Sequence, residues 1–138
     1  MQAPQDLFEQ ATRARERAYS PYSKFQVGVA VRAKTGTIIT GCNVENASYG
    51  LTICAERVAL SHAVSQGILE FTQMVIVTDT APPTPPCGAC RQFIYEFASN
   101  LEIWTCNLRG THRHFHLSEI LPEAFGPATL NKARESKS

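Results

Sequence analysis

The chain has 138 residues, of which 43% are hydrophobic and 18% are charged, and its formal net charge is +1 at pH 7. These values are typical of one folded domain with a substantial core, and they exclude a largely disordered chain. The near-neutral charge offers no broad basic surface to a polyanion, so nucleic acid is not expected as a partner.

The N-terminus and the cysteines indicate the compartment. The N-terminus is polar and mixed in charge, without the apolar stretch of a signal peptide, and no apolar run is long enough to span a bilayer. Five cysteines in a chain without that signal favour reduced thiols and metal ligands over a disulfide framework. We therefore expect a cytoplasmic protein without membrane contact. It should form a single domain over residues 1–138, with a frayed polar tail at about 132–138.

The beginning of the chain predicts one helix and one strand. Residues 4–19 place apolar side chains at helical spacing, and Ser20-Pro21 ends the run. Residues 25–31 alternate large apolar side chains with small or polar ones, which is typical of a strand. Because Gly28 and Ala30 are small, we expect a helix to pack closely on that face of the strand.

A hairpin and a polar loop are expected next. Lys34-Thr35-Gly36 has the composition of a turn, and residues 37–40 are rich in β-branched side chains, so a second strand should pair with the first. The Asn-rich segment 41–50 is too polar for a core strand. We interpret it as a loop that lines a site.

The rest of the chain alternates helices and strands around a proline-rich loop at 78–86. Helical spacing and cap residues predict helices at 53–66 and 87–97. The apolar run 74–77 is typical of a strand that is buried on both faces. Further elements are expected towards the end of the chain: strands at 101–106 and 112–116 and one helical turn at 118–121.

This order of elements predicts an α/β fold, namely a three-layer α/β/α sandwich around a mixed sheet of about five strands. If the helices at 53–66 and 87–97 follow adjacent parallel strands, their N-termini meet in one crevice at the carboxyl edge of the sheet. The sequence contains no repeat, linker or domain boundary.

Three cysteines are positioned to share a metal ion. Cys87 and Cys90 are three residues apart at a predicted helix start, so both sulfurs project from one face. Cys54 begins the other helix, and a helix N-terminus favours a thiolate over a thiol. Zinc accepts sulfur ligands in a tetrahedral arrangement, so three cysteines leave the fourth position to water. Glu56, two residues after Cys54, is well placed to move protons there.

A structural zinc site is the alternative interpretation. A single Cys-x-x-Cys pair is common in such sites, and the fourth ligand would come from Cys42, Cys106 or a histidine. The protein would then be a zinc-stabilised binding module without enzymatic activity. Glu56 favours the catalytic interpretation, because an unpaired carboxylate beside a metal is a poor structural choice and a good proton shuttle.

Three motifs resemble those of the small, homotetrameric, zinc-dependent cytidine deaminases: Asn43-Val44-Glu45-Asn46, Cys54-Ala55-Glu56-Arg57 and Pro86-Cys87-Gly88-Ala89-Cys90. The resemblance extends from about Tyr22 to Phe125, and the motifs agree with the family in order and spacing. It implies a cytidine deaminase-like fold and the hydrolytic deamination of cytidine and 2′-deoxycytidine to uridine and 2′-deoxyuridine. The pathway implied is pyrimidine nucleoside salvage.

The resemblance also implies the metal site and the catalytic residue. Cys54, Cys87 and Cys90 would hold one Zn²⁺ per subunit, with water as the fourth ligand. Glu56 would take a proton from that water and deliver it to the ring nitrogen and then to the leaving amino group. Because zinc with three thiolates is net negative, we expect Arg57 to offset the excess charge at the sulfurs.

Residues from four parts of the chain would bind the substrate by this resemblance. Asn43 and Glu45 would recognise the ribose hydroxyls. The backbone at Ala55 would bind the pyrimidine carbonyl. Phe25 would form a wall of the base pocket, although it also begins the alternating segment and would serve equally as a core residue.

Two aromatic residues are assigned to contacts between subunits on the same basis. Phe125 matches a family phenylalanine that reaches into a neighbouring subunit's site. Tyr49 matches a position near a subunit contact, and we include it among the substrate-binding residues. The expected partners are therefore the nucleoside and further copies of this chain, as a homotetramer with sites completed by neighbouring subunits.

Other deaminase activities fit the zinc motif less well. A deaminase of a cytosine-based analogue such as blasticidin S shares the motif, but residues 43–46 and Phe125 favour the ordinary nucleoside. A deaminase that edits nucleic acids would need a positively charged channel, which this near-neutral chain does not offer.

Three histidines and two cysteines near the family motifs have no role in the family pattern. His112, His114 and His116 alternate, so a strand would place all three on one face, where they could bind a metal. We favour a solvent-facing edge strand instead, because these positions match no family ligand. Cys42 and Cys106 are expected to be small buried residues without an assigned role.

Overall fold

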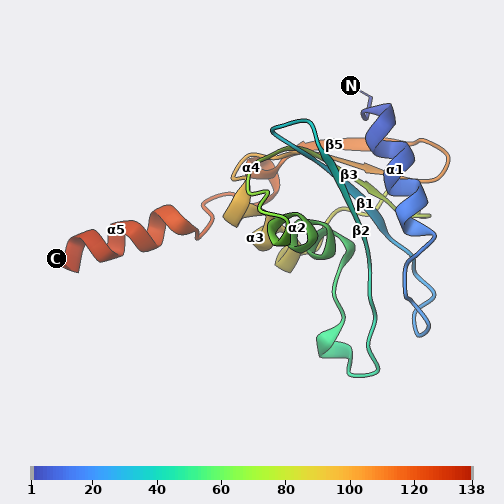
Figure 1. Ribbon diagram of the computed structural model, residues 1–138, viewed down its shortest axis with the longest axis horizontal. Helices are drawn as coiled ribbons and strands as arrows, with labels where there is room; N and C mark the ends of the chain where they lie inside the picture. Colours follow the sequence, from blue (N-terminus) through green and yellow to red (C-terminus); the bar gives the residue numbers. More distant parts are fainter. Residues whose placement is uncertain (1, 138) are drawn as a thin grey trace.

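A five-stranded sheet forms the central layer of the computed structural model, which describes residues 2–137 and the side chains of residues 2–132 (Figure 1). The strand order is β2-β1-β3-β4-β5. Only β3 and β4 pair in parallel, and the other neighbours are antiparallel. The strands are β1 (Gly28–Ala33), β2 (Ile38–Cys42), β3 (Phe71–Val77), β4 (Glu102–Cys106) and β5 (His112–His116).

Helices cover both faces of this sheet. Helix α1 lies on one side, and α2 and α3 lie together on the other (Figure 1). The expected three-layer α/β/α arrangement with a mixed sheet is thus confirmed. The helical elements are α1 (Gln5–Arg15), the short 3₁₀ helix η1 (Tyr49–Leu51), α2 (Ala55–Ser65), α3 (Gly88–Phe97), α4 (Leu117–Ile120) and α5 (Pro127–Lys137).

The alternation of β1 divides the core into two layers. Val29 and Val31 point to the α2/α3 side, whereas Ala30 between them points to the α1 side, where it meets Leu7 and Ala11 of α1. All five side chains are fully buried. Burying a valine or leucine side chain contributes about 1.5–3 kcal/mol to the free energy of unfolding.

Two glycines allow the helices to approach the sheet without an intervening side chain. A Cβ atom on Gly28 would overlap the carbonyl oxygen of Ala11 in α1, as the small residues of this strand predict. A Cβ atom on Gly41 of β2 would lie 2.8 Å from Ala59 Cα and 2.9 Å from the carbonyl oxygen of Ala55, both in α2. The position of α2 is therefore set by backbone-to-backbone contact with β2.

The strand directions bring α2 and α3 to one edge of the sheet. β1 is antiparallel to both β2 and β3, so β2 and β3 run the same way, and their carboxyl ends share an edge. The expected crevice therefore exists, but β2 and β3 are separated by β1. The condition of adjacent strands is therefore not met, although the two strands that precede the helices do run in the same direction.

Segments around the first helix differ from the predicted boundaries. Helix α1 ends at Arg15 and not at residue 19, because Tyr19 pairs with the loop at residues 43–45: its N–H donates to the Asn43 carbonyl and its carbonyl accepts from the Glu45 N–H. β1 begins at Gly28 and not at Phe25. The backbone between Phe25 and Val27 bonds instead to the side chain of Asn43.

The edge and the end of the chain also differ from expectation. β5 is an edge strand, as predicted, but its three histidines are half-buried and not solvent-facing. The His114 ring lies 4.7 Å from the ring of buried Trp104. Cys106 is buried as expected, whereas Cys42 is half-buried. Helix α5 was not predicted, and it projects away from the other elements (Figure 1). Residue 138 lies outside the described residues, and fraying at about 132–138 stays a prediction.

Within residues 2–137, no helix has both the length and the apolar character that crossing a membrane requires.

The contact between Gly41 and α2 can be tested by adding one methyl group. We expect Gly41→Ala to destabilise the protein by about 1–3 kcal/mol, because the new Cβ must displace the backbone of α2. Urea unfolding of the metal-loaded protein measures this. Gly50→Ala is the matched control, since a Cβ there meets nothing within 4 Å. Equal midpoints for the Gly41 variant and the parent would contradict the packing described.

Candidate active site

The three predicted metal ligands meet where α2 and α3 begin. Cys54 is the N-cap residue of α2 and Cys87 that of α3, both with extended backbone, and Cys90 lies in the first turn of α3. Their ligand atoms all lie within 4.8 Å of one another, and the Cys87 and Cys90 sulfurs are 3.4 Å apart. Cys90 is buried, Cys54 half-buried and Cys87 exposed, so the cluster opens to one side.

A positively charged side chain, Arg57, lies beside the sulfur of Cys54. Arg57, one turn after Cys54, extends Nη2 to 3.6 Å from the Cys54 sulfur and 3.4 Å from the carbonyl oxygen of Thr52. A hydrogen bond from Cys90 and the Arg57 guanidinium lower the pKa of Cys54 to about 5. The hydrogen bond to Cys54 raises the pKa of Cys90, and burial and the nearby Glu56 carboxylate add to the increase.

This donor set suits a thiophilic cation. The Cys54 thiol is ionised already, and Cys90 gives up its proton when a positive charge arrives beside it. Three sulfurs on two helix N-termini match the ligand preference of zinc and leave one tetrahedral position without a protein ligand. Among residues with described side chains, no fourth cysteine or histidine joins the cluster, which disfavours a closed structural site.

Glu56 is a buried carboxyl group beside the sulfurs. It lies in the first turn of α2, is 5% exposed, and lines the same cavity as Cys54 and Cys87. Burial raises the pKa of Glu56 above its ordinary value, and the nearby Cys54 thiolate adds to the increase. A raised pKa brings the carboxyl group closer to the range in which it both accepts and releases a proton near neutral pH.

A cavity of about 240 Å³ opens in front of Glu56. This volume is at the small end of ligand pockets and suits one small molecule. Most of the predicted substrate-binding and metal-binding residues contribute to its wall. Those that line the cavity are Phe25, Asn43, Glu45, Cys54, Ala55, Glu56 and Cys87.

The two polar residues predicted for ribose recognition also build the loop around the cavity. The Asn43 side chain accepts from the Val27 N–H at 2.9 Å and donates to the Phe25 carbonyl at 2.7 Å. One carboxylate oxygen of Glu45 accepts from two successive backbone N–H groups, those of Tyr22 and Ser23, at 3.0 and 3.1 Å. The other is bonded to the Ser23 hydroxyl, and these contacts lower the pKa of Glu45.

Two predicted substrate-binding residues lie outside this cavity. Tyr49 is 76% exposed in η1, where its ring meets that of Tyr22 edge to face. Phe125 is 56% exposed in the segment before α5, and its carbonyl accepts a hydrogen bond from Gln92 of α3. Within one chain, neither side chain contributes to the cavity wall.

Several wall residues were not identified from the sequence: Val27, Thr52, Ile76, Thr78, Thr84 and Pro85. Thr78 carried a usable signal, because it is the first polar residue after the buried strand β3 and therefore lies at the carboxyl edge of the sheet. Its hydroxyl bonds to that of Thr80 at 3.1 Å, and Thr80 bonds to Thr84 at 2.8 Å. These contacts hold the proline-rich loop against the cavity.

Comparison with known proteins identifies a matching family. A family model described as the cytidine and deoxycytidylate deaminase zinc-binding region matches residues 1–104. A cytidine deaminase of Halalkalibacterium halodurans is 48% identical over 92% of this chain and 97% of its own length. One of Sporosarcina psychrophila is 45% identical over 94% of this chain and 96% of its own length.

Solved structures agree with these relatives. The crystal structure of cytidine deaminase from Burkholderia pseudomallei has a TM-score of 0.86 and 45% identity, covering 89% of this chain and 99% of its own. The cytidine deaminase from Mycobacterium tuberculosis has a TM-score of 0.77 and 39% identity, covering 88% of this chain and 95% of its own.

The lowered pKa of Cys54 predicts selective alkylation in the metal-free protein. Because the thiolate persists down to about pH 5, iodoacetamide should modify Cys54 at a nearly constant rate from about pH 6 to 9. Buried Cys106, whose pKa burial raises to about 11, should stay unmodified. Peptide mass spectrometry at a series of pH values gives both rates. A Cys54 rate that rises tenfold per pH unit through this range would contradict the assignment.

Proposed function

The chain belongs to the cytidine and deoxycytidylate deaminase family, and on that premise we propose that it hydrolyses cytidine and 2′-deoxycytidine to uridine and 2′-deoxyuridine. The reaction consumes one water and releases ammonia, in pyrimidine nucleoside salvage. The observation that carries the proposal is that three convergent thiols and a buried carboxyl group open on one small cavity.

Zinc would be held by the sulfurs of Cys54, Cys87 and Cys90, one ion per subunit. When bound, zinc acts as a Lewis acid and brings the pKa of a coordinated water towards about 7. Arg57 holds the Cys54 sulfur and withdraws negative charge from it, which limits the loss of Lewis acidity that three thiolates would cause.

Glu56 moves the protons of the reaction. Its carboxylate takes a proton from the attacking water as the water oxygen bonds to C4 of the base, and it donates that proton to the ring nitrogen N3. It next accepts the remaining hydroxyl proton and delivers it to the amino group, which leaves as ammonia. One carboxyl group serves each transfer because burial raises its pKa and the cavity holds the groups within reach.

The cavity wall supplies contacts for the substrate. The backbone at Ala55 meets the pyrimidine carbonyl, at the N-terminus of α2 where N–H groups have no intrahelical partner. Phe25 covers the base. Asn43 and Glu45 receive the ribose hydroxyls through the hydrogen-bonding capacity that their loop contacts leave unused.

We propose a homotetramer in which neighbouring chains complete each cavity. The loop between β2 and α2 exposes several large apolar side chains on one chain, and such a patch is typical of an interface. Phe125 and Tyr49 would reach across to neighbouring chains. The exposed apolar residues on or beside this loop are Tyr19, Tyr22, Val44, Tyr49, Leu51 and Ile53.

The cytoplasm is the compartment that we propose for this protein. All five cysteines are free thiols, and the metal site that we assign to three of them needs reducing conditions to persist.

The role of Glu56 predicts a separation of activity from metal content. Glu56→Gln should lower kcat for cytidine by about 10²–10⁴-fold or more, because the amide cannot transfer the proton. The variant should keep one zinc per chain. The ultraviolet change of cytidine gives the rate, and elemental analysis gives the zinc content.

Glu96→Gln is the control for this experiment, since Glu96 is exposed on α3, and it should retain full activity. Loss of zinc together with activity in the Glu56 variant would instead assign Glu56 a structural role.

The role of Arg57 predicts a graded effect of charge. Arg57→Ala should lower zinc affinity or kcat on the order of 10-fold or more, as is typical when a group bonded to a metal ligand is removed. Arg57→Lys keeps the positive charge and should recover part of the loss. Zinc competition with a chromophoric chelator, alongside turnover, measures both. Unchanged zinc content and turnover in the alanine variant would exclude the charge-balancing role.

A further inference from the structure

A second cluster of metal-type ligands lies on the α1 side of the sheet, away from the three thiols. Glu102 of β4 and His114 and His116 of β5 each offer one ligand atom, and these atoms lie within 4.8 Å of one another. All three side chains are half-buried. We propose that Glu102, His114 and His116 form a second metal site, which binds a divalent transition-metal ion such as Ni²⁺ or Zn²⁺.

The strand register brings these three residues together. Glu102 and His116 are directly opposite in the antiparallel β4–β5 pair, and His114 faces Trp104 two positions along. Because alternate residues of a strand share a face, the three side chains project to the same side. The backbone ladder thus holds the cluster in place, independently of any metal.

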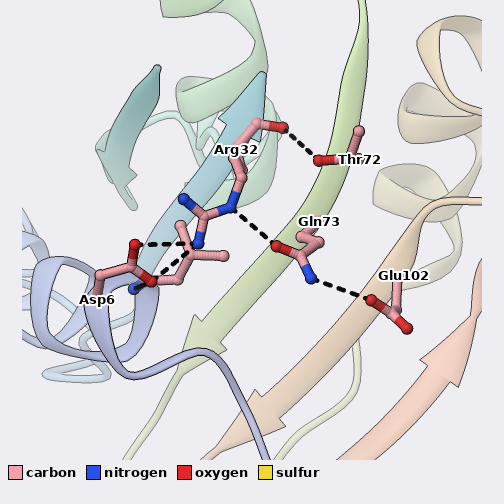
Figure 2. Close-up of polar contacts among 6 residues, drawn as sticks. Asp6, Arg32, Thr72, Gln73 and Glu102 are labelled. Atoms are coloured by element: carbon pink, nitrogen blue, oxygen red, sulfur yellow. Dashed lines mark hydrogen bonds and ion pairs between the residues drawn. The ribbon is translucent and has the colours of Figure 1, made fainter. Parts of the chain in front are cut away.

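A chain of polar contacts across the sheet orients the Glu102 carboxylate (Figure 2). Its Oε1 accepts from Gln73 Nε2 at 3.2 Å, and Gln73 Oε1 in turn accepts from Arg32 Nε at 2.9 Å. Arg32 is held by the Asp6 carboxylate of α1 at 2.8 and 3.0 Å. With Oε1 used in this way, Oε2 is the oxygen that faces His114, at 3.2 Å from Nε2.

The His114 nitrogen proposed as a ligand has no hydrogen bond within the part of the chain that the structure describes. His114 Nε2 is buried and lies 3.2 Å from Glu102 Oε2 without a hydrogen bond to it. It is one of a few buried side-chain nitrogen and oxygen atoms in the described residues that have no hydrogen-bond partner. The His116 side chain accepts a hydrogen bond from the Glu119 backbone N–H in the capping box of α4, and its Nδ1 lies 3.4 Å from Glu119 Oε1, so we assign Nε2 to the metal.

The ligand types select the class of ion. Two imidazoles and one carboxylate suit Zn²⁺, Ni²⁺, Cu²⁺ or Co²⁺, whereas Ca²⁺ and Mg²⁺ prefer oxygen ligands alone. A bound ion would also satisfy the orphaned nitrogen of His114. It would tie β4 to β5 and to the start of α4, because His116 is the N-cap residue of that helix.

The chain contains its own probe for this site. Trp104 is the only tryptophan, and its ring lies 4.7 Å from that of His114. Ni²⁺ titrated into the zinc-loaded protein should therefore quench the tryptophan fluorescence and saturate at one equivalent per chain. Equilibrium dialysis with elemental analysis gives the stoichiometry independently. Ni²⁺ should also raise the thermal unfolding midpoint, because it binds only the folded chain.

Removing a group that is hydrogen-bonded to a metal ligand typically weakens metal binding by about 10–100-fold. Substituting one of the three ligands themselves should weaken Ni²⁺ binding by at least this factor. His116→Asn is suitable because asparagine remains a good N-cap residue for α4. His114→Asn and Glu102→Gln complete the set. Each variant should keep its turnover of cytidine, since none of these residues lines the active-site cavity.

His112→Asn is the matched control, because His112 lies on the same strand and face but outside the cluster. It should bind Ni²⁺ as the parent does. If the His114 and His116 variants bind Ni²⁺ with the parent's affinity, the proposal is wrong. It also fails if the binding survives in these variants and disappears in Cys87→Ser, because the ion would then occupy the thiol site.

Discussion

The contact of β2 with α2 is the constraint on which the active site depends. Because Gly41 has no side chain, the backbone of α2 lies directly on the strand, and this fixes where Cys54 and Glu56 stand at the start of the helix. Helix α3 reaches the same edge of the sheet through the parallel β3–α3–β4 connection. The three sulfurs meet because α2 and α3, which follow different strands, both begin at the same edge of the sheet.

Charge balance at that edge determines what the cluster does. Burial raises the pKa of Glu56, and Arg57 is the cation hydrogen-bonded to the Cys54 sulfur. The negative charge of the metal-free cluster therefore rests on the Cys54 sulfur, beside that guanidinium. A structural zinc site would need neither the buried carboxyl group of Glu56 nor the cavity of about 240 Å³ in front of it. The surroundings of the sulfurs, more than the sulfurs themselves, distinguish an enzyme from a stabilised fold.

Much of the fold and site could be predicted because local patterns and motif spacing agree. The alternating side chains around Gly28 predict a strand with a closely packed helix. The spacing of Cys87 and Cys90 predicts that both sulfurs project from one face of a helix. Long-range polar contacts were beyond such patterns. Asn43 takes the backbone partners that strand pairing would have used at Phe25, and Trp104 half-covers His114. These effects depend on residues far apart in the chain, so no local periodicity reveals them.

The loop contacts of Glu45 limit how the enzyme can change over evolution. Its carboxylate holds the backbone at Tyr22 and Ser23 and lines the cavity, in addition to the ribose contact that we propose for it. A substitution of Glu45 that changed the preferred sugar would also remove the hydrogen bonds that hold the backbone at Tyr22 and Ser23. Variation in nucleoside choice is therefore more accessible at Pro85, which lines the cavity from the proline-rich loop. Pro85 is therefore a more evolvable position in the cavity lining than Glu45.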